Sequence, residues 1–205
     1  HPVEVEAPVE AERGDVLHVL IDQSSSMRTM QAAAYEGVRE LVESQPDGMG
    51  VVFSTFSSRV QIGVRRTKEE ALTSIEQREA NGSTALYDAI VAAVGAGDEP
   101  GQGQTLVVCT DGQDTASRHT ALDARRAAES YAARGGRLLF LGANQDAVLT
   151  AQTLGVPVGR ALTFSSDPEH MRSAMRSVSE SVRAHRVHGT DGFTASHRSA
   201  ASAPA

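Results

Sequence analysis

Oxygen-bearing side chains gather at three places in the sequence, each beside a segment of regular apolar spacing. These clusters are Asp22–Ser26, Asn81–Thr84 and Thr110–Gly112. In the first cluster, Asp22, Ser24 and Ser26 occupy alternate positions, so their side chains can converge on one point. Carboxylates and hydroxyls without His or Cys are hard ligands, which suit Mg²⁺ rather than Zn²⁺. We therefore expect a divalent-cation site if the fold brings the three clusters together.

The segments around the clusters predict strands that could position them. Short, mostly apolar runs are typical of strands buried on both faces, whereas strict alternation is typical of an edge strand. The apolar runs are 16–21, 51–56, 105–110 and 137–141, with a last strand over 158–164, and the alternating run is 60–64. We expect the alternating run to pair antiparallel with its neighbour.

Helical spacing of apolar residues fills the intervals between the strands. It predicts helices over 30–41, 67–77, 85–96, 121–133, 146–154 and 168–184. Strand–helix alternation predicts a doubly wound, Rossmann-like α/β fold: a mostly parallel sheet with one antiparallel edge strand and helices on both faces. Ligand sites in such folds lie at the carboxyl ends of the strands, where the three clusters fall.

Composition excludes several classes of protein. Hydrophobic residues make up 40% and charged residues 22%, as in an ordinary globular chain. No apolar run approaches the roughly 20 residues that span a bilayer, so we expect no membrane span. A net charge of -7 gives no basic surface for nucleic acid. The single cysteine, Cys109, cannot form an intramolecular disulfide, which favours a cytoplasmic location.

A length of 205 residues predicts one domain with tails. Residues 1–14 are acidic and contain prolines, which indicates an extended or mobile lead-in. Residues 15–187 hold all the predicted strands and helices and form the expected domain. Residues 188–205 are rich in Gly, Ser, Ala and Thr, so we expect a flexible C-terminal tail.

The three clusters together resemble a known motif. An apolar strand followed by Asp22-x-Ser24-x-Ser26, then Thr84 after Gly82, then Thr110-Asp111-Gly112, resembles the metal-ion-dependent adhesion site (MIDAS) of von Willebrand factor A (VWA) domains. All five ligand positions are filled, in the expected order. The resemblance covers roughly residues 15–184. Segments 142–146 and 193–198 also look like those of stand-alone bacterial or phage VWA proteins.

The resemblance implies a division of labour among the five residues. Ser24 and Ser26 would bind Mg²⁺ directly, with Mn²⁺ and Ca²⁺ as the alternative ions. Thr84 and Asp111 would bind it directly or through water, and Asp22 would orient waters and serine hydroxyls. A partner protein would complete the site with an Asp or Glu side chain. Bacterial VWA proteins often work beside AAA+ ATPases, which suggests one class of partner. The implied activity is metal-dependent protein–protein interaction, without catalysis.

Two alternatives stay open at this point. The first is a Mg²⁺-dependent hydrolase or phosphatase, although the acid/base Asp expected two residues after Asp22 is Ser24. The only lysine, Lys68, lies before the middle helix, so none is placed downstream to bind phosphate. The second is a structural domain with a vestigial site. Two further acids, Asp88 and Asp114, are candidates for a supporting role around the metal. For Asp88, a position in the first turn of a helix already has a dipole explanation.

Overall fold

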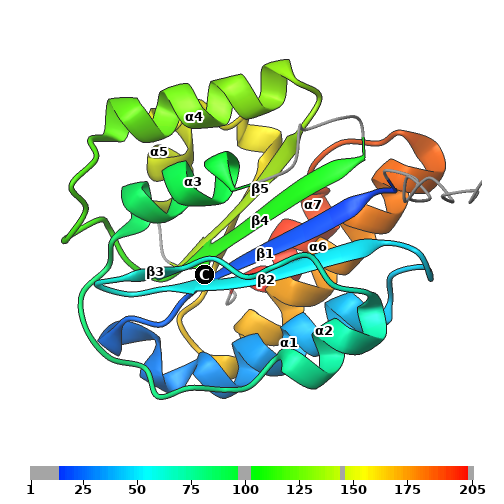
Figure 1. Cartoon of the computed structure of the whole chain (residues 1–205), viewed down its shortest axis with the longest axis horizontal. Coiled ribbons are helices and arrows are strands. Elements are labelled where there is room, and N and C mark those ends of the chain that lie inside the picture. Colours follow the sequence, from blue (N-terminus) through cyan, green and yellow to red (C-terminus); the bar gives the residue numbers. More distant parts are fainter. Residues whose placement is uncertain (1–13, 97–102, 144–145, 203–205) are drawn as a thin grey trace, which may run out of the picture.

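A six-stranded sheet lies between two layers of helices in the computed structural model, which describes residues 14–96, 103–143 and 146–202 (Figure 1). The strand order is β3-β2-β1-β4-β5-β6. Every neighbouring pair is parallel except β2 and β3. The strands are β1 (Val16–Asp22), β2 (Gly50–Phe56), β3 (Val60–Gln61), β4 (Gln104–Thr110), β5 (Arg137–Ala143) and β6 (Ala161–Phe164). This arrangement confirms the predicted fold class.

Helices cover both faces of the sheet (Figure 1). One layer contains α1 (Gln31–Glu43), α2 (Lys68–Ser74), α6 (Pro168–His188) and α7 (Ala195–Ala201). The other contains α3 (Leu86–Gly95), α4 (Ala121–Ala133) and α5 (Asp146–Thr153). Two short 3₁₀ helices are η1 (Ser25–Thr29) and η2 (Val158–Arg160). In the described ranges, no helix is both long enough and apolar enough to cross a membrane.

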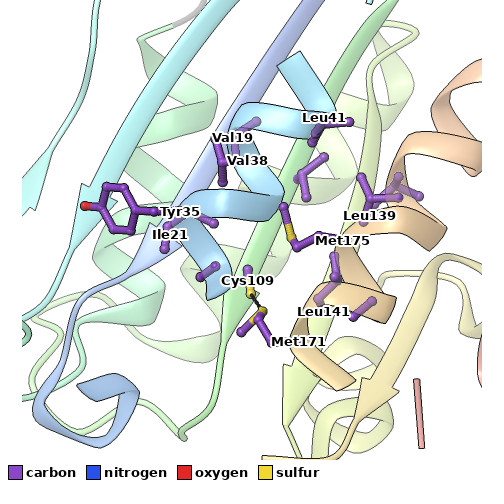
Figure 2. Packing of buried hydrophobic residues seen from close by; sticks show 14 of the residues in the cluster. Val19, Ile21, Tyr35, Val38, Leu41, Cys109, Leu139, Leu141, Met171 and Met175 are labelled. Carbon is purple, nitrogen blue, oxygen red and sulfur yellow. Dashed lines mark hydrogen bonds between the residues drawn. The ribbon is translucent and has the colours of Figure 1, made fainter. Parts of the chain in front are cut away.

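Alternate residues of the buried strands supply two separate cores. Val19 and Ile21 of β1 face the α1–α6 layer, whereas Leu20 packs with α3 and α4. Figure 2 shows the first core, where Met175 and Met171 of α6 approach the sheet. Cys109 is fully buried there, with its Sγ 4.0 Å from Met171 Sδ. Burial raises the pKa of this thiol, so Cys109 acts as a small apolar core residue.

The edge strand is shorter than its alternating sequence predicts. Gln61 pairs with Thr55, and the next contact with β2 is the isolated bridge between Arg66 and Val51. Residues 62–65 thus face residues 52–54, one residue fewer, which is a β-bulge. A Cβ at Gly63 would lie 2.1 Å from the Phe53 carbonyl oxygen, so only glycine allows this approach.

The predictions for the two ends of the chain have different outcomes. Residues 1–13 of the predicted lead-in and residues 144–145 of the 142–146 segment lie outside the described residues. The tail expected over 188–205 instead contains α7, which starts at a capping box on Thr194. Phe193 and Ala201 are buried, and the Ser165 N–H donates to the Ala201 carbonyl. The helix is hard to predict from the sequence because small and polar residues surround its two apolar anchors, Phe193 and Ala201.

Candidate metal site

The fold brings the three oxygen-bearing clusters together at the carboxyl ends of β1 and β4. These strands pair in parallel, with Ile21 opposite Cys109, so Asp22 and Asp111 leave the sheet side by side. The sheet is wound in opposite directions on either side of β1, which makes this position a topological switch point. Ser24 and Ser26 lie at the start of η1, and Thr84 lies just before α3.

Four of the five predicted ligands surround one small space. The Oγ atoms of Ser24 and Ser26 are 3.1 Å apart, and Ser26 Oγ donates to Asp111 Oδ1 at 2.8 Å. A Cβ at Gly112 would lie 3.6 Å from Thr84 Oγ1 and 4.0 Å from Ser26 Oγ. Glycine at this position therefore leaves open the space that these hydroxyls face.

The fifth residue, Asp22, is fully buried behind this space, and both of its oxygens are already bonded. Oδ1 accepts the Ser24 N–H at 2.7 Å, and Oδ2 accepts the Thr110 hydroxyl at 2.6 Å. Burial raises the pKa of Asp22, and the nearby charge of Asp111 adds to the effect. Thr110 is a positioning residue that the sequence analysis placed in the motif without a role. Its place beside Asp111 at the strand end was the available signal.

Asp111 is half-buried, and burial raises its pKa as well. Within the described ranges, neither Asp22 nor Asp111 forms an ion pair with Lys, Arg or His. Two close carboxylates without a cation repel each other and lose hydration, at a cost in free energy. In the part of the chain that the structure describes, the two carboxylates thus form a negative site without a counter-charge, which favours binding of a cation.

The donor set suits a small, hard cation. Neighbouring ligands of an octahedral Mg²⁺ shell with bonds of about 2.1 Å are about 3 Å apart, close to the 3.1 Å and 2.8 Å between the oxygen atoms of this site. Among the described residues, no group of three or more His, Cys, Asp or Glu side chains could hold a metal ion. Any metal at this place would thus bind chiefly to hydroxyls and one or two carboxylates.

Backbone bonds fix the second cluster to the first. The Ser25 N–H donates to the Gly82 carbonyl at 3.0 Å, and the Asn81 N–H donates to the Gln23 carbonyl at 2.9 Å. Gly82 has a φ of 82°, in the left-handed region that favours glycine. The loop that carries Thr84 is therefore held against the loop that carries the serines.

The two supporting candidates, Asp88 and Asp114, bind the loop after β4 and not the five predicted ligands. Asp88 Oδ1 accepts the His119 N–H at 2.8 Å and the Arg118 N–H at 3.1 Å. Asp114 accepts the Tyr87 N–H at 3.3 Å and also the Ser117 hydroxyl. Both acids tie this loop to the start of α3, so any influence on Asp111 would pass through the loop.

Comparisons with known proteins agree with this geometry. Residues 17–113 match the family model of the von Willebrand factor type A domain. That range contains all five predicted ligands. The sheet order and the flanking helices are those of the Rossmann-like VWA fold. No curated protein matches the chain.

Solved structures support the same fold at low sequence identity. Proximal thread matrix protein 1 from the mussel byssus, with a zinc-occupied MIDAS motif, is 18% identical with a TM-score of 0.67, covering 83% of this chain and 48% of that chain. A von Willebrand factor type A protein from Catenulispora acidiphila is 19% identical (TM-score 0.65; 82% and 42% covered). The conserved hypothetical protein BatB from Bacteroides thetaiotaomicron is 18% identical (TM-score 0.62; 82% and 96% covered). The chain thus spans less than half the length of the first two.

Proposed function

We propose that this chain is a VWA domain that binds a divalent cation and, through it, an acidic side chain of a partner protein. One observation carries the proposal. The carboxylates of Asp22 and Asp111 converge with hydroxyls from three loops, and no cationic side chain of the described residues pairs with either carboxylate. The VWA family match over residues 17–113 supports the same assignment.

The residues divide the work of holding the cation. Ser24 and Ser26 are the proposed direct ligands, since their Oγ atoms are 3.1 Å apart, as neighbouring ligands of one small cation would be. Thr84 and Asp111 bind directly or through water. Asp22 keeps Ser24 in place from behind, because the Ser24 N–H and Thr110 occupy its oxygens. With Asp111 as the only carboxylate in direct contact, a bound divalent cation would keep net positive charge and a free coordination position, which attract a carboxylate.

Mg²⁺ is the proposed ion because the donors are oxygen atoms and their spacing fits its small shell. The mussel protein holds zinc at its MIDAS motif. Zn²⁺, Mn²⁺ and Ca²⁺ are therefore tested beside Mg²⁺. The proposed location is the cytoplasm, and an AAA+ ATPase is the proposed partner class.

A hydrolase gains no specific support from the site. The histidine that follows the metal loop, His119, has its Nδ1 bonded to Asp88 at 2.7 Å. In the described part of the chain, no histidine hydrogen-bonds to any of the five predicted ligands. Among the described residues, no histidine is thus bonded where it could act as a general base on a metal-bound water.

Calorimetric titration of MgCl₂ into chelator-treated protein tests the first part of the proposal. We expect single-site binding for the wild type and its loss in Ser24→Ala. Ser25→Ala is the matched control, because this exposed serine lies in the same loop but outside the ligand set. Absence of binding for all four ions, or equal binding by the two variants, would contradict the proposed site.

A pair of peptides tests the second part. Metal-loaded protein is titrated with acetyl-Ala-Glu-Ala-amide and with the Gln analogue, which differs only in charge at the central side chain. We expect weak binding of the Glu peptide that EDTA abolishes, and no binding of the Gln peptide. Equal binding of both peptides would refute recognition through a carboxylate.

A further inference from the structure

A cavity of about 290 Å³ lies at the amino ends of β1 and β4, whereas the candidate metal site lies at the carboxyl ends of the same strands. It is bounded by the sheet, the end of α3 and Tyr131 of α4. The apolar part of its wall includes Val16, Val52, Ile62, Ala93 and Leu106. This volume is near the lower limit for pockets that hold small molecules.

His18 brings a hydrogen-bond donor to this cavity. The side chain is 8% exposed, and Nε2 lies 2.7 Å from Ser54 Oγ. Ser54 Oγ already accepts the Gly63 N–H at 3.0 Å, so its own hydrogen is available for Nε2. With the Ser54 hydroxyl donating to Nε2, the neutral ring carries its proton on Nδ1. Burial lowers the pKa of His18 to about 4, which keeps the ring uncharged near neutral pH.

Tyr131 brings a second polar group. It is 6% exposed, and its ring is packed so closely on Gly136 that a Cβ there would lie 2.5 Å from Tyr131 Cε1. Neither the Tyr131 hydroxyl nor His18 Nδ1 has a hydrogen bond to another described residue. Among the same residues, Arg137 Nη1 is the buried side-chain nitrogen or oxygen without a partner. The other two atoms are thus open to space, and the cavity is the space that their side chains line.

We propose that this cavity binds a small uncharged molecule with an apolar ring system of about ten heavy atoms and one hydrogen-bond acceptor. The apolar wall recognises the ring, and His18 and Tyr131 recognise the acceptor. The single charged side chain in the wall, Arg65, is exposed, so the buried part of an ionised ligand would lack a counter-charge. The site is independent of the proposed metal function, because its wall contains none of the five predicted ligands.

The experiment uses two probes that differ in the acceptor alone. 1-Indanone has a bicyclic ring and a carbonyl, and indane has the same ring without it. Binding to the full chain is followed by NMR shifts of the His18 ring and the Ala93 methyl group. We expect both probes to shift Ala93, and 1-indanone to bind about three- to tenfold more tightly than indane.

Three variants locate the binding. Tyr131→Phe removes one hydroxyl and should reduce the preference for 1-indanone while leaving the affinity for indane unchanged. Ala93→Leu fills the cavity and should abolish binding of both probes. Ala92→Leu, on another face of the same helix and outside the cavity wall, should bind as the wild type does. Circular dichroism checks that each variant is folded.

Several results would overturn the proposal. These are no shift at His18 or Ala93 in the wild type, no preference for 1-indanone, or wild-type affinity in a folded Ala93→Leu variant. Binding that appears only after removal of residues 1–13 would also overturn it, because the chain itself would then occupy the cavity. Since the wild-type shifts are read directly, the proposal is tested even if Ala93→Leu does not fold. Mg²⁺ titrations of the same variants should match the wild type.

Discussion

The two ends of the sheet treat buried charge in opposite ways. At the amino end of β5, Arg137 is 3% exposed, and Asp191 Oδ1 lies 3.0 Å from its Nε. Ser181 Oγ also accepts from this guanidinium. At the carboxyl ends of β1 and β4, Asp22 and Asp111 have bonds only to neutral groups in the described part of the chain. Among the residues that the structure describes, the charge of Arg137 is thus paired with an opposite charge, and the charges of Asp22 and Asp111 are not.

The difference separates a structural role from a proposed binding role. A charge that serves only to hold the fold is stable when the chain supplies its partner, as Asp191 does for Arg137 and Arg160. Unneutralised carboxylates destabilise the free protein, and this cost is recovered if a cation binds. Buried acids of one sign that converge without a partner are therefore a signal of a ligand site.

The largest expected effect comes from removing the counter-charge of Arg137 at the amino end of β5. Asp191→Asn leaves Arg137 buried without a counter-charge and should lower the free energy of unfolding by about 2–3 kcal/mol, less than for a fully buried pair because Asp191 is 43% exposed. Urea unfolding measures it. Adding Arg137→Met removes the unpaired charge and should recover most of the loss. If the double variant is no more stable than the single one, the pair is not the cause.

His18 is buried in its uncharged form, and this predicts that stability depends on pH. The pKa of His18 is about 4 in the folded chain against 6.5 when exposed, so as the pH falls below 6.5 the unfolded chain binds a proton first. Stability that is complete above pH 6.5 is lost toward pH 4, by about 2 kcal/mol between pH 7.5 and 5. His18→Gln lacks this contribution. Parallel pH profiles of the wild type and His18→Gln would show that His18 is not buried as described.

The metal end can be blocked without removing a ligand. The side chain of Gly112→Val would enter the space between Thr84 and Ser26, so Mg²⁺ affinity should fall at least tenfold, or about 1.4 kcal/mol. Since Gly112 has no positive φ, the free energy of unfolding without metal should change little. Calorimetry gives the affinity and urea unfolding the stability. Unchanged affinity would mean that the cation lies elsewhere.

The smallest effect concerns the loop after β4. Asp88→Asn keeps the side-chain shape but weakens the bonds to the Arg118 and His119 N–H groups. We expect Mg²⁺ affinity to change by no more than about threefold, because Asp88 acts only through the loop. Complete loss of binding in the calorimeter would instead place Asp88 among the metal ligands.

Much of the fold could be predicted from the sequence because its signals are local. Buried strands show as apolar runs such as 105–110, and Thr120 and Asp123 form the capping box that starts α4. The short edge strand could not be predicted, because its bulge depends on contact between Gly63 and the backbone of β2. The packing of α7 also depends on residues distant in sequence, such as Arg198 donating to the Ala161 carbonyl at 2.7 Å.

Prediction of the site from the sequence is limited in the same way, because contacts between distant residues leave no local signal. The three clusters follow from residue types at strand–helix junctions, and the set of five ligands follows from the resemblance to the VWA motif. The structure places four of the five around one space and Asp22 behind it. The bond from Thr110 to Asp22 and the role of Asp88 depend on how side chains orient in three dimensions. In the sequence, Asp88 is simply an acid in the first turn of a helix. Its bonds reach residues that lie 30 and 31 positions ahead, which no local pattern encodes.

Unfolding of the wild type and Asp111→Asn, each with and without Mg²⁺, tests the central claim most directly. Without metal, the variant should be at least as stable as the wild type, because it removes a charge that repels Asp22 and keeps an acceptor for Ser26. Mg²⁺ at 100 times its Kd should stabilise the wild type by about 2.7 kcal/mol and leave the variant unchanged. A variant that is clearly less stable without metal, or an equal response of both proteins to Mg²⁺, would contradict the account.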